Sequence, residues 1–159
     1  MSYSHTQRVP KGVLTAFGAV GGVAALRTPG LVKPLLGATM AGLLYTFRSM
    51  TVSIDEHHIN IVFGDWLSLK QIKLAYIQKV ETKRMCPLSG WGVHFVGDGW
   101  LYNVFGLDAV RVSMNSGKII YIGTDEPLLL AAAIREAANL PDIDLTEEEE
   151  ELEVDSLTS

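Results

Sequence analysis

The chain has 159 residues and a single cysteine, Cys86. One cysteine excludes an intramolecular disulfide and agrees with a reducing compartment. The first 50 residues contain no Asp or Glu, and residues 142–159 contain no Lys or Arg. Neither of the two long apolar runs reaches the roughly 20 residues that comfortably span a bilayer. The length predicts one modest domain, and the absences of charged residues predict that the two ends of the chain carry charge of opposite sign.

The formal charge of −5 averages three unlike segments. Residues 1–50 carry five basic residues, whereas residues 142–159 carry nine acidic ones. Without that acidic end, residues 1–141 hold 13 Lys+Arg and 9 Asp+Glu, a formal +4. Such a small excess without a binding motif predicts no nucleic-acid partner. The acidic run 147–151 predicts a solvated, disordered tail over residues 141–159.

Two apolar runs, 12–26 and 31–47, are separated by a Pro-Gly turn and predict a helical hairpin over residues 12–47. Small residues recur at helical spacing, as at Gly18 and Gly22, and such spacing lets membrane helices approach closely. In a water-soluble helix each glycine would cost about 1 kcal/mol relative to alanine. The pattern therefore predicts a short pair of transmembrane helices that anchors the chain in a membrane.

An interfacial or re-entrant helix pair, and a glycine-rich pair packed on protein, are the alternatives to a membrane-crossing hairpin. A signal peptide is disfavoured, because a second apolar run follows without an obvious cleavage site. Three basic residues lie outside the runs and two lie around their connection, which favours both ends in the cytoplasm. Residues 1–11 form a polar, basic N-terminal segment, and we expect it to be disordered or interfacial.

Residues 90–112 predict the centre of a small sheet. The dipeptide Asp98-Gly99 stands between two aromatic, β-prone runs and suits the turn of a two-residue hairpin. Alternating apolar and polar residues between 51 and 122 predict seven or eight antiparallel strands in all. The segment 124–127 is a helix start with a proline in the first turn, so one amphipathic helix closes the domain.

Several pieces of the chain occur in an order and spacing that point to a family. They are Gly90-Trp91-Gly92, Gly99-Trp100-Leu101-Tyr102-Asn103-Val104, Gly106, Asp108-Ala109-Val110, Gly117-Lys118 and Ile122-Gly123-Thr124-Asp125-Glu126-Pro127. In these pieces residues 51–140 resemble the small bacterial pleckstrin-homology-like (PH-like) domain proteins of largely unassigned function, in which a short hydrophobic hairpin precedes the domain. The resemblance implies a mainly β fold, an antiparallel barrel or sandwich capped by one C-terminal helix, and a membrane-anchored layout.

The resemblance supplies no catalytic residues and does not extend to phosphoinositide binding. PH domains that bind such lipids carry basic residues on the first two strands and their connecting loop. Here that loop is the acidic segment 55–57, and no Lys or Arg occurs between Arg48 and Lys70. A phosphate site at this position would have the wrong charge.

Six residues are candidates for an interaction surface: Trp91, Trp100, Tyr102, Lys79, Lys83 and Arg84. The aromatic side chains could line a ligand groove or accept a peptide strand, or they could pack within the sheet. The basic side chains could face anionic lipid headgroups, or they could form a solvated strand face. No cofactor is implied.

Two pairs of residues are weak candidates for chemistry. His57 and His58 lack a third metal ligand at a suitable spacing, so we expect no metal site. Cys86 and His94 could form a nucleophile–base pair, and a small hydrolase that uses them is the least favoured function class.

The sequence therefore predicts a non-enzymatic, membrane-anchored PH-like interaction or scaffolding module. Residues 12–47 would contact the lipid bilayer of the cell membrane, and residues 51–140 would face the cytoplasm, where they bind a protein partner or a second copy. The alternative is a soluble or peripheral PH-like domain that binds a ligand or peptide and whose N-terminal helices pack on protein.

Overall fold

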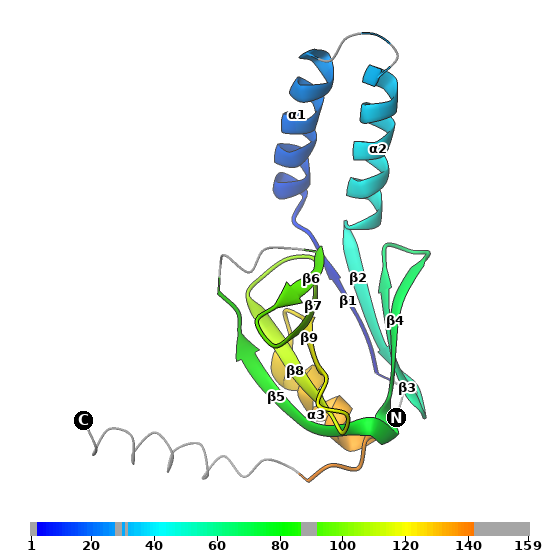
Figure 1. Ribbon diagram of the computed structural model, residues 1–159, viewed down its shortest axis with the longest axis vertical. Coiled ribbons are helices and arrows are strands. Elements are labelled where there is room, and N and C mark those ends of the chain that lie inside the picture. The colour runs from blue at the N-terminus through cyan, green and yellow to red at the C-terminus, as the bar shows by residue number, and fades with distance from the viewer. Residues whose placement is uncertain (1–2, 28–29, 31, 87–91, 142–159) are drawn as a thin grey trace, which may run out of the picture.

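The computed structural model describes residues 3–27, 30, 32–86 and 92–141. Its described part is mainly β, with two unclosed sheets and three α-helices (Figure 1). The first sheet has the order β1-β2-β3-β4, and the second has the order β5-β8-β9-β7-β6. This architecture is compatible with a PH-like fold.

The strands of the first sheet are β1 (Tyr3–Arg8), β2 (Ser49–Ile54), β3 (His58–Phe63) and β4 (Leu67–Lys73). Those of the second are β5 (Ile77–Arg84), β6 (Gly92–Val96), β7 (Gly99–Asn103), β8 (Asp108–Met114) and β9 (Ile119–Gly123). The helices are α1 (Lys11–Arg27), α2 (Val32–Thr46) and α3 (Pro127–Ala137). A single 3-10 turn, Leu74–Tyr76, connects the two sheets between β4 and β5.

The hydrophobic core lies between the two sheets and α3. On β3 the alternating side chains of Ile59, Ile61 and Phe63 are fully buried, as period-two alternation predicts. Leu130 and Ile134 of α3 are equally buried, and α3 packs against β5 and β8. The closing helix predicted from the sequence is therefore confirmed, and it covers the core at one side of the second sheet.

The first strand of the fold lies in the N-terminal segment 1–11, which we expected to be disordered or interfacial. Tyr3–Arg8 forms β1, which pairs with β2 in the register Tyr3↔Ile54 to Arg8↔Ser49. The prediction that the fold begins with a helical hairpin was therefore wrong. The eight strands β2–β9 agree with the seven or eight expected between residues 51 and 122, and β1 adds a ninth outside that range.

Side chains on β1 attach it to distant parts of the domain. Gln7 is buried, and its Nε2 donates a hydrogen bond of 2.7 Å to the carbonyl oxygen of Phe105. The imidazole of His5 lies 2.7 Å from a carboxylate oxygen of Asp125. Burial raises the pKa of Tyr3 to about 12, with smaller contributions from Glu126 and Asp125. The N-terminal strand is thus part of the domain.

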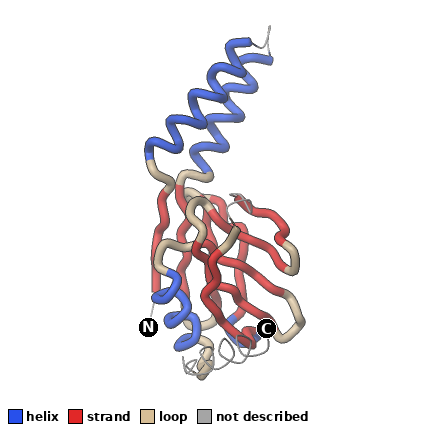
Figure 2. Tube along the Cα trace, turned by 90° about the vertical axis from the view of Figure 1, so that its left-hand side faces the viewer, coloured by secondary structure: helices blue, strands red, loops and turns tan. Residues whose placement is uncertain are grey.

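Helices α1 and α2 form an insertion between two neighbouring strands, and we call them the helix pair. The register pair Arg8↔Ser49 closes the β1–β2 ladder, and the next amide, Val9 N, donates to Arg48 O at 2.9 Å. Both ends of the helix pair therefore enter the same sheet at adjacent positions. Figures 1 and 2 show the helix pair extending away from the two sheets.

The central hairpin of the sequence is present, with its turn one residue earlier than predicted. Strands β6 and β7 pair from Gly92↔Asn103 to Val96↔Gly99, so the turn is Gly97-Asp98. The β8–β9 hairpin is antiparallel, as expected. Strand β7, however, pairs with β9 in parallel, through Gly99↔Ile119 to Tyr102↔Ile122. The second sheet is therefore mixed rather than wholly antiparallel.

The acidic loop between β2 and β3 is organised by Asp55. Its Oδ1 accepts hydrogen bonds from the backbone amides of His57 and His58 at 2.8 and 2.7 Å, and its Oδ2 accepts one from Asn60. The bond from the His57 amide is the main cause that lowers the pKa of Asp55 below its ordinary value. The carboxylate therefore has a structural role in this turn.

Candidate interaction surface

The largest group of exposed apolar side chains lies on the helix pair. Val20 is 71% exposed and Leu35 is 68% exposed, and both helices contribute. Among the described side chains of the helix pair, the exposed large apolar ones are Phe17, Val20, Val23, Val32, Leu35, Leu43 and Tyr45. Residues 12–26 and 34–47 carry no charged side chain. A helix that is apolar on all sides is typical of burial in lipid or in a larger protein.

The two helices pack against each other through small residues of α1. A Cβ atom at Gly21 would lie 3.1 Å from Cε of Met40, and one at Gly18 would lie 3.9 Å from Cδ1 of Leu44. A Cβ at Gly22 would meet nothing within 4 Å. The close approach of the helices therefore uses Gly18 and Gly21, instead of the predicted pair Gly18 and Gly22.

Aromatic and basic side chains gather at the base of the helix pair, where α2 joins β2. The guanidinium of Arg48 lies 4.2 Å from the centroid of the Tyr45 ring, within the range of a cation–π contact. Arg48 also forms an ion pair with Asp65 in the turn between β3 and β4. The adjacent Trp66 is 65% exposed. Tyr, Trp and Arg at one end of an apolar segment are typical of the membrane–water interface.

The β3–β4 turn approaches α2 closely enough to require glycine. Gly64 has a φ of +61°, and a Cβ atom there would lie 3.1 Å from the carbonyl oxygen of Thr46. Its amide donates to Ser49 O at 2.8 Å. The turn that carries Trp66 is therefore held against the base of α2.

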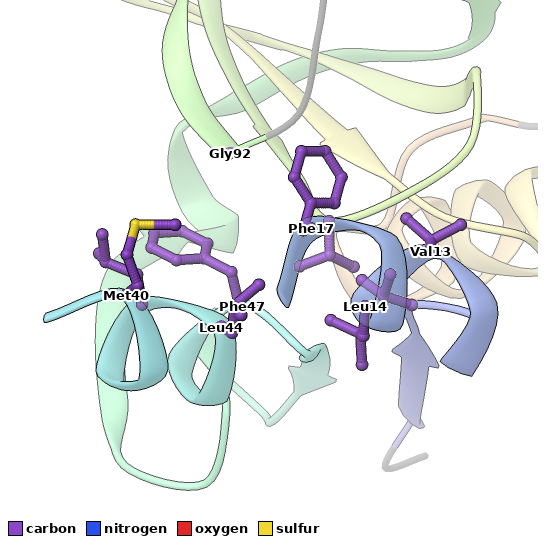
Figure 3. A pocket seen from close by; sticks show the side chains of 10 residues that line it. Val13, Leu14, Phe17, Met40, Leu44, Phe47 and Gly92 are labelled. Atoms are coloured by element: carbon purple, nitrogen blue, oxygen red, sulfur yellow. The ribbon is translucent and has the colours of Figure 1, made fainter. Parts of the chain in front are cut away.

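An apolar cavity of about 410 Å³ lies between the base of the helix pair and the sheets (Figure 3). Its walls come from α1, from α2 and from the sheet side of the molecule. The lining residues are Val9, Val13, Leu14, Phe17, Met40, Leu43, Leu44, Phe47, Gly92 and Val104. Every one of these residues is apolar, so the cavity suits a hydrocarbon ligand.

The basic residues predicted for an interaction surface lie on β5 and differ in their ion pairing. Lys79 forms an ion pair with Glu81 at 2.8 Å, and Glu81 in turn pairs with Arg111 at 2.8 Å. Burial would raise the pKa of Glu81, but the hydrogen bonds from Lys79 and Arg111 outweigh it and lower that pKa. Lys83 and Arg84 are exposed at the end of β5. Among the described residues, Lys83 and Arg84 form no ion pair with a carboxylate and are presented to solvent at this strand end.

The aromatic residues predicted for that surface do not share one environment. Tyr102 is 8% exposed and belongs to the core, where burial raises its pKa. Trp100 is 50% exposed and lies edge-on to Phe95, with ring centroids 6.1 Å apart. Trp91 lies outside the described residues. The six predicted residues are therefore not brought together as one surface by the part of the chain that the structure describes.

The weak candidates for chemistry gain no support from the geometry. Cys86 is exposed just after β5, and His94 is half-buried on β6. His57 and His58 stack with ring centroids 6.4 Å apart. Within the described residues, no group of three or more His, Cys, Asp or Glu side chains could hold a metal ion.

The helices of the helix pair are shorter than a membrane span requires. Among the residues that the structure describes, no helix is both long enough and apolar enough for a membrane span. The 17 residues of α1 extend about 25 Å, compared with a hydrocarbon core of about 30 Å. The prediction of a transmembrane helix was therefore wrong.

No family model, no curated protein and no solved structure matches this chain. The fold class therefore rests on the two sheets and the C-terminal helix themselves.

Sequence reasoning missed the residues that the structure gathers at the base of the helix pair. Tyr45 and Trp66 are 21 positions apart in the chain. The β3–β4 turn that carries Trp66 approaches the backbone of Tyr45 and Thr46 through Gly64. The signal available in the sequence was Tyr-Thr-Phe-Arg at residues 45–48, an aromatic and basic end to an apolar run. That signal marks α2, but it does not indicate Trp66.

Proposed function

We propose that this protein is a non-catalytic PH-like interaction module that is held at a membrane surface by lipid contact of the helix pair. The observation that carries the proposal is the apolar surface of α1 and α2, which extends away from the sheets and is exposed on both helices. Contiguous exposed apolar surface on a domain marks a site of interaction with a membrane or a protein. The module contacts lipid without crossing the bilayer.

The charges at the two ends of the helix pair fit insertion from one side. Lys11 and Arg48 lie at the base, and Arg27 and Lys33 lie at the far end. Long basic side chains can extend from apolar surroundings to the lipid headgroups. If the helix pair is tilted in the membrane, the basic residues at both of its ends can reach headgroups while its uncharged middle lies in lipid. Tyr45 and Trp66 then lie at headgroup depth beside the sheets.

The domain faces the cytoplasm in this proposal. The basic residues outside the apolar runs and the free Cys86 favour that side. The two sheets then present the exposed pair Phe95 and Trp100 and the strand end at Lys83 and Arg84 to a protein partner or a second copy. No reaction is assigned to the module.

The test is flotation of the full-length protein with neutral phosphatidylcholine vesicles. Wild-type protein is expected to float with the vesicles, whereas the variant V20E/L35E stays in the aqueous fraction. A charged side chain costs about 2.5–3.5 kcal/mol at the centre of an inserted helix, and each 1.4 kcal/mol is about a tenfold change in partition. Both positions are exposed, so the substitutions leave the packing of the sheets unchanged.

The matched control is L128E/L129E on α3, where Leu128 is 75% exposed and Leu129 is 60% exposed. It introduces the same two carboxylates on exposed leucines outside the helix pair and is expected to float as wild type does. Wild-type protein that remains aqueous while folded would contradict lipid contact. It would favour the alternative in which the helices pack on protein.

A further inference from the structure

We propose that the apolar cavity at the base of the helix pair binds one acyl chain of a bilayer phospholipid. The proposal rests on the lipid contact proposed above, and it adds a defined binding site to a general apolar surface. The cavity volume of about 410 Å³ falls in the range of roughly 300–1,000 Å³ that is typical of small-molecule sites.

The chemistry of the walls selects a hydrocarbon. A buried water needs two to four polar partners, and the lining side chains provide no hydrogen-bonding donor or acceptor of the usual N or O type. Apolar cavities that exclude water bind apolar ligands instead. An acyl chain gains dispersion contacts with all three walls, whereas a headgroup would lose its hydration without compensation.

The walls are held apart by packing outside the cavity. Phe47 lines the cavity, and its ring meets that of the fully buried Phe63 edge-on at a centroid distance of 5.3 Å. On the sheet side, Gly92 contributes no side chain, and a Cβ atom there would meet nothing within 4 Å. The space is therefore set by the fixed position of α2 on the core and by the bare backbone of β6.

The cavity is continuous with the surface that contacts lipid. Phe17 of α1 and Leu43 of α2 line it, yet their side chains are 45% and 49% exposed. Figure 3 shows side chains of α1 and of α2 on two sides, with Gly92 beyond them. A chain can therefore enter from the bilayer while its headgroup stays outside. This continuity favours a membrane phospholipid over a free fatty acid as the source of the chain.

The test uses vesicles that contain the full-length protein and a phosphatidylcholine with a photoreactive diazirine midway along one acyl chain. After illumination, mass spectrometry locates the adducts. Val104 is the diagnostic position, because it is 3% exposed, lines the cavity and lies outside the helix pair. Adducts are expected at Val104 as well as on the outer helix surface at Val20 and Leu35.

A filling substitution provides the second readout. The variant Val13→Trp places a large ring in the cavity and is expected to reduce the adduct at Val104 several-fold while flotation stays unchanged. The matched control is Val20→Trp, on the same helix but outside the cavity, and it is expected to leave the Val104 adduct intact. Should Val13→Trp fail to fold, the adduct positions on the unmodified chain decide the question alone.

The outcomes separate this inference from the proposed function. Adducts at Val20 and Leu35 without any at Val104 would overturn the acyl-chain site and leave lipid contact standing. Protein that neither floats nor forms adducts would overturn both. A photoreactive free fatty acid that labels Val104 where the phospholipid does not would overturn the phospholipid as the occupant.

Discussion

Truncation of Phe63 to alanine is expected to lower the free energy of unfolding by about 3–5 kcal/mol, as for other fully buried aromatic side chains. Phe63 is 0% exposed at the end of β3, and its ring contacts Phe47 edge-on. The loss includes the transfer of the ring to water and the cavity that it leaves. It also removes the contact that holds the base of α2 on the sheets.

Urea unfolding of the full chain in mild detergent, followed by near-UV circular dichroism, measures this loss. The control Phe95→Ala removes the same ring from an exposed position and is expected to cost less than about 1 kcal/mol, since surface substitutions have small effects. Equal losses for the two variants would contradict the burial of Phe63 in the core.

The second large effect is expected from Gly99→Ala, at the start of the parallel pairing between β7 and β9. A Cβ atom at Gly99 would lie 2.6 Å from the carbonyl oxygen of Ile119 and 2.9 Å from its Cγ2. Backbone cannot move aside as a flexible side chain can, so the two strands must separate. We expect a loss of about 3 kcal/mol, at the upper end for overpacked positions.

Thermal unfolding of Gly99→Ala beside Gly37→Ala tests this expectation. Gly37 lies within α2, and a Cβ atom there would meet nothing within 4 Å. Alanine at such a helix position is expected to stabilise by up to about 1 kcal/mol. A Gly99→Ala variant as stable as wild type would contradict the close parallel pairing of β7 with β9.

The insertion of the helix pair within the first sheet has a mechanical consequence. The pair leaves and re-enters the sheet at Arg8 and Ser49, which are register partners. An anchor joined to a domain by a single linker can rotate freely, but one joined through two adjacent strands cannot. The Arg48–Asp65 ion pair and the approach of Gly64 to Thr46 add further contacts at the same place. Lipid contact of the helices would thus orient both sheets relative to the membrane.

The elements that the sequence predicts well are those with a strong local signal. The helix start at Pro127 and the central hairpin near Asp98-Gly99 depend on neighbouring residues alone. Strand β3 shows clean alternation, and Ile59, Ile61 and Phe63 are buried as a result. In each case a few adjacent residues contain the information that determines the structure.

The sequence does not predict strand β1, because apolar and polar residues hardly alternate in Tyr-Ser-His-Thr-Gln-Arg. It is a strand through its pairing with β2, about 40 residues away and beyond both helices. The parallel neighbours β7 and β9 are likewise separated by β8. Such pairings are decided by tertiary packing, which a local pattern does not record.

The candidate site is still less visible in the sequence. The basic residues of β5 form a cluster in the sequence. In the structure, however, Lys79 forms an ion pair with Glu81, and Glu81 also pairs with Arg111. The cavity combines α1, α2 and the sheet side, and only the folded chain brings Leu14, Phe47 and Val104 together. Apolar composition indicates that the helices contact lipid or protein, but it does not indicate a cavity at their base.

The most direct test of lipid contact is the accessibility of single nitroxide labels in the full-length protein. The chain has one cysteine, so a C86S background allows labels at V20C and L35C on the helix pair and at L128C on α3. With neutral vesicles, lipid contact predicts that the labels at V20C and L35C relax strongly with oxygen and weakly with a water-soluble nickel complex, whereas the label at L128C does the reverse. Water-like accessibility at V20C and L35C, equal to that at L128C, would contradict it.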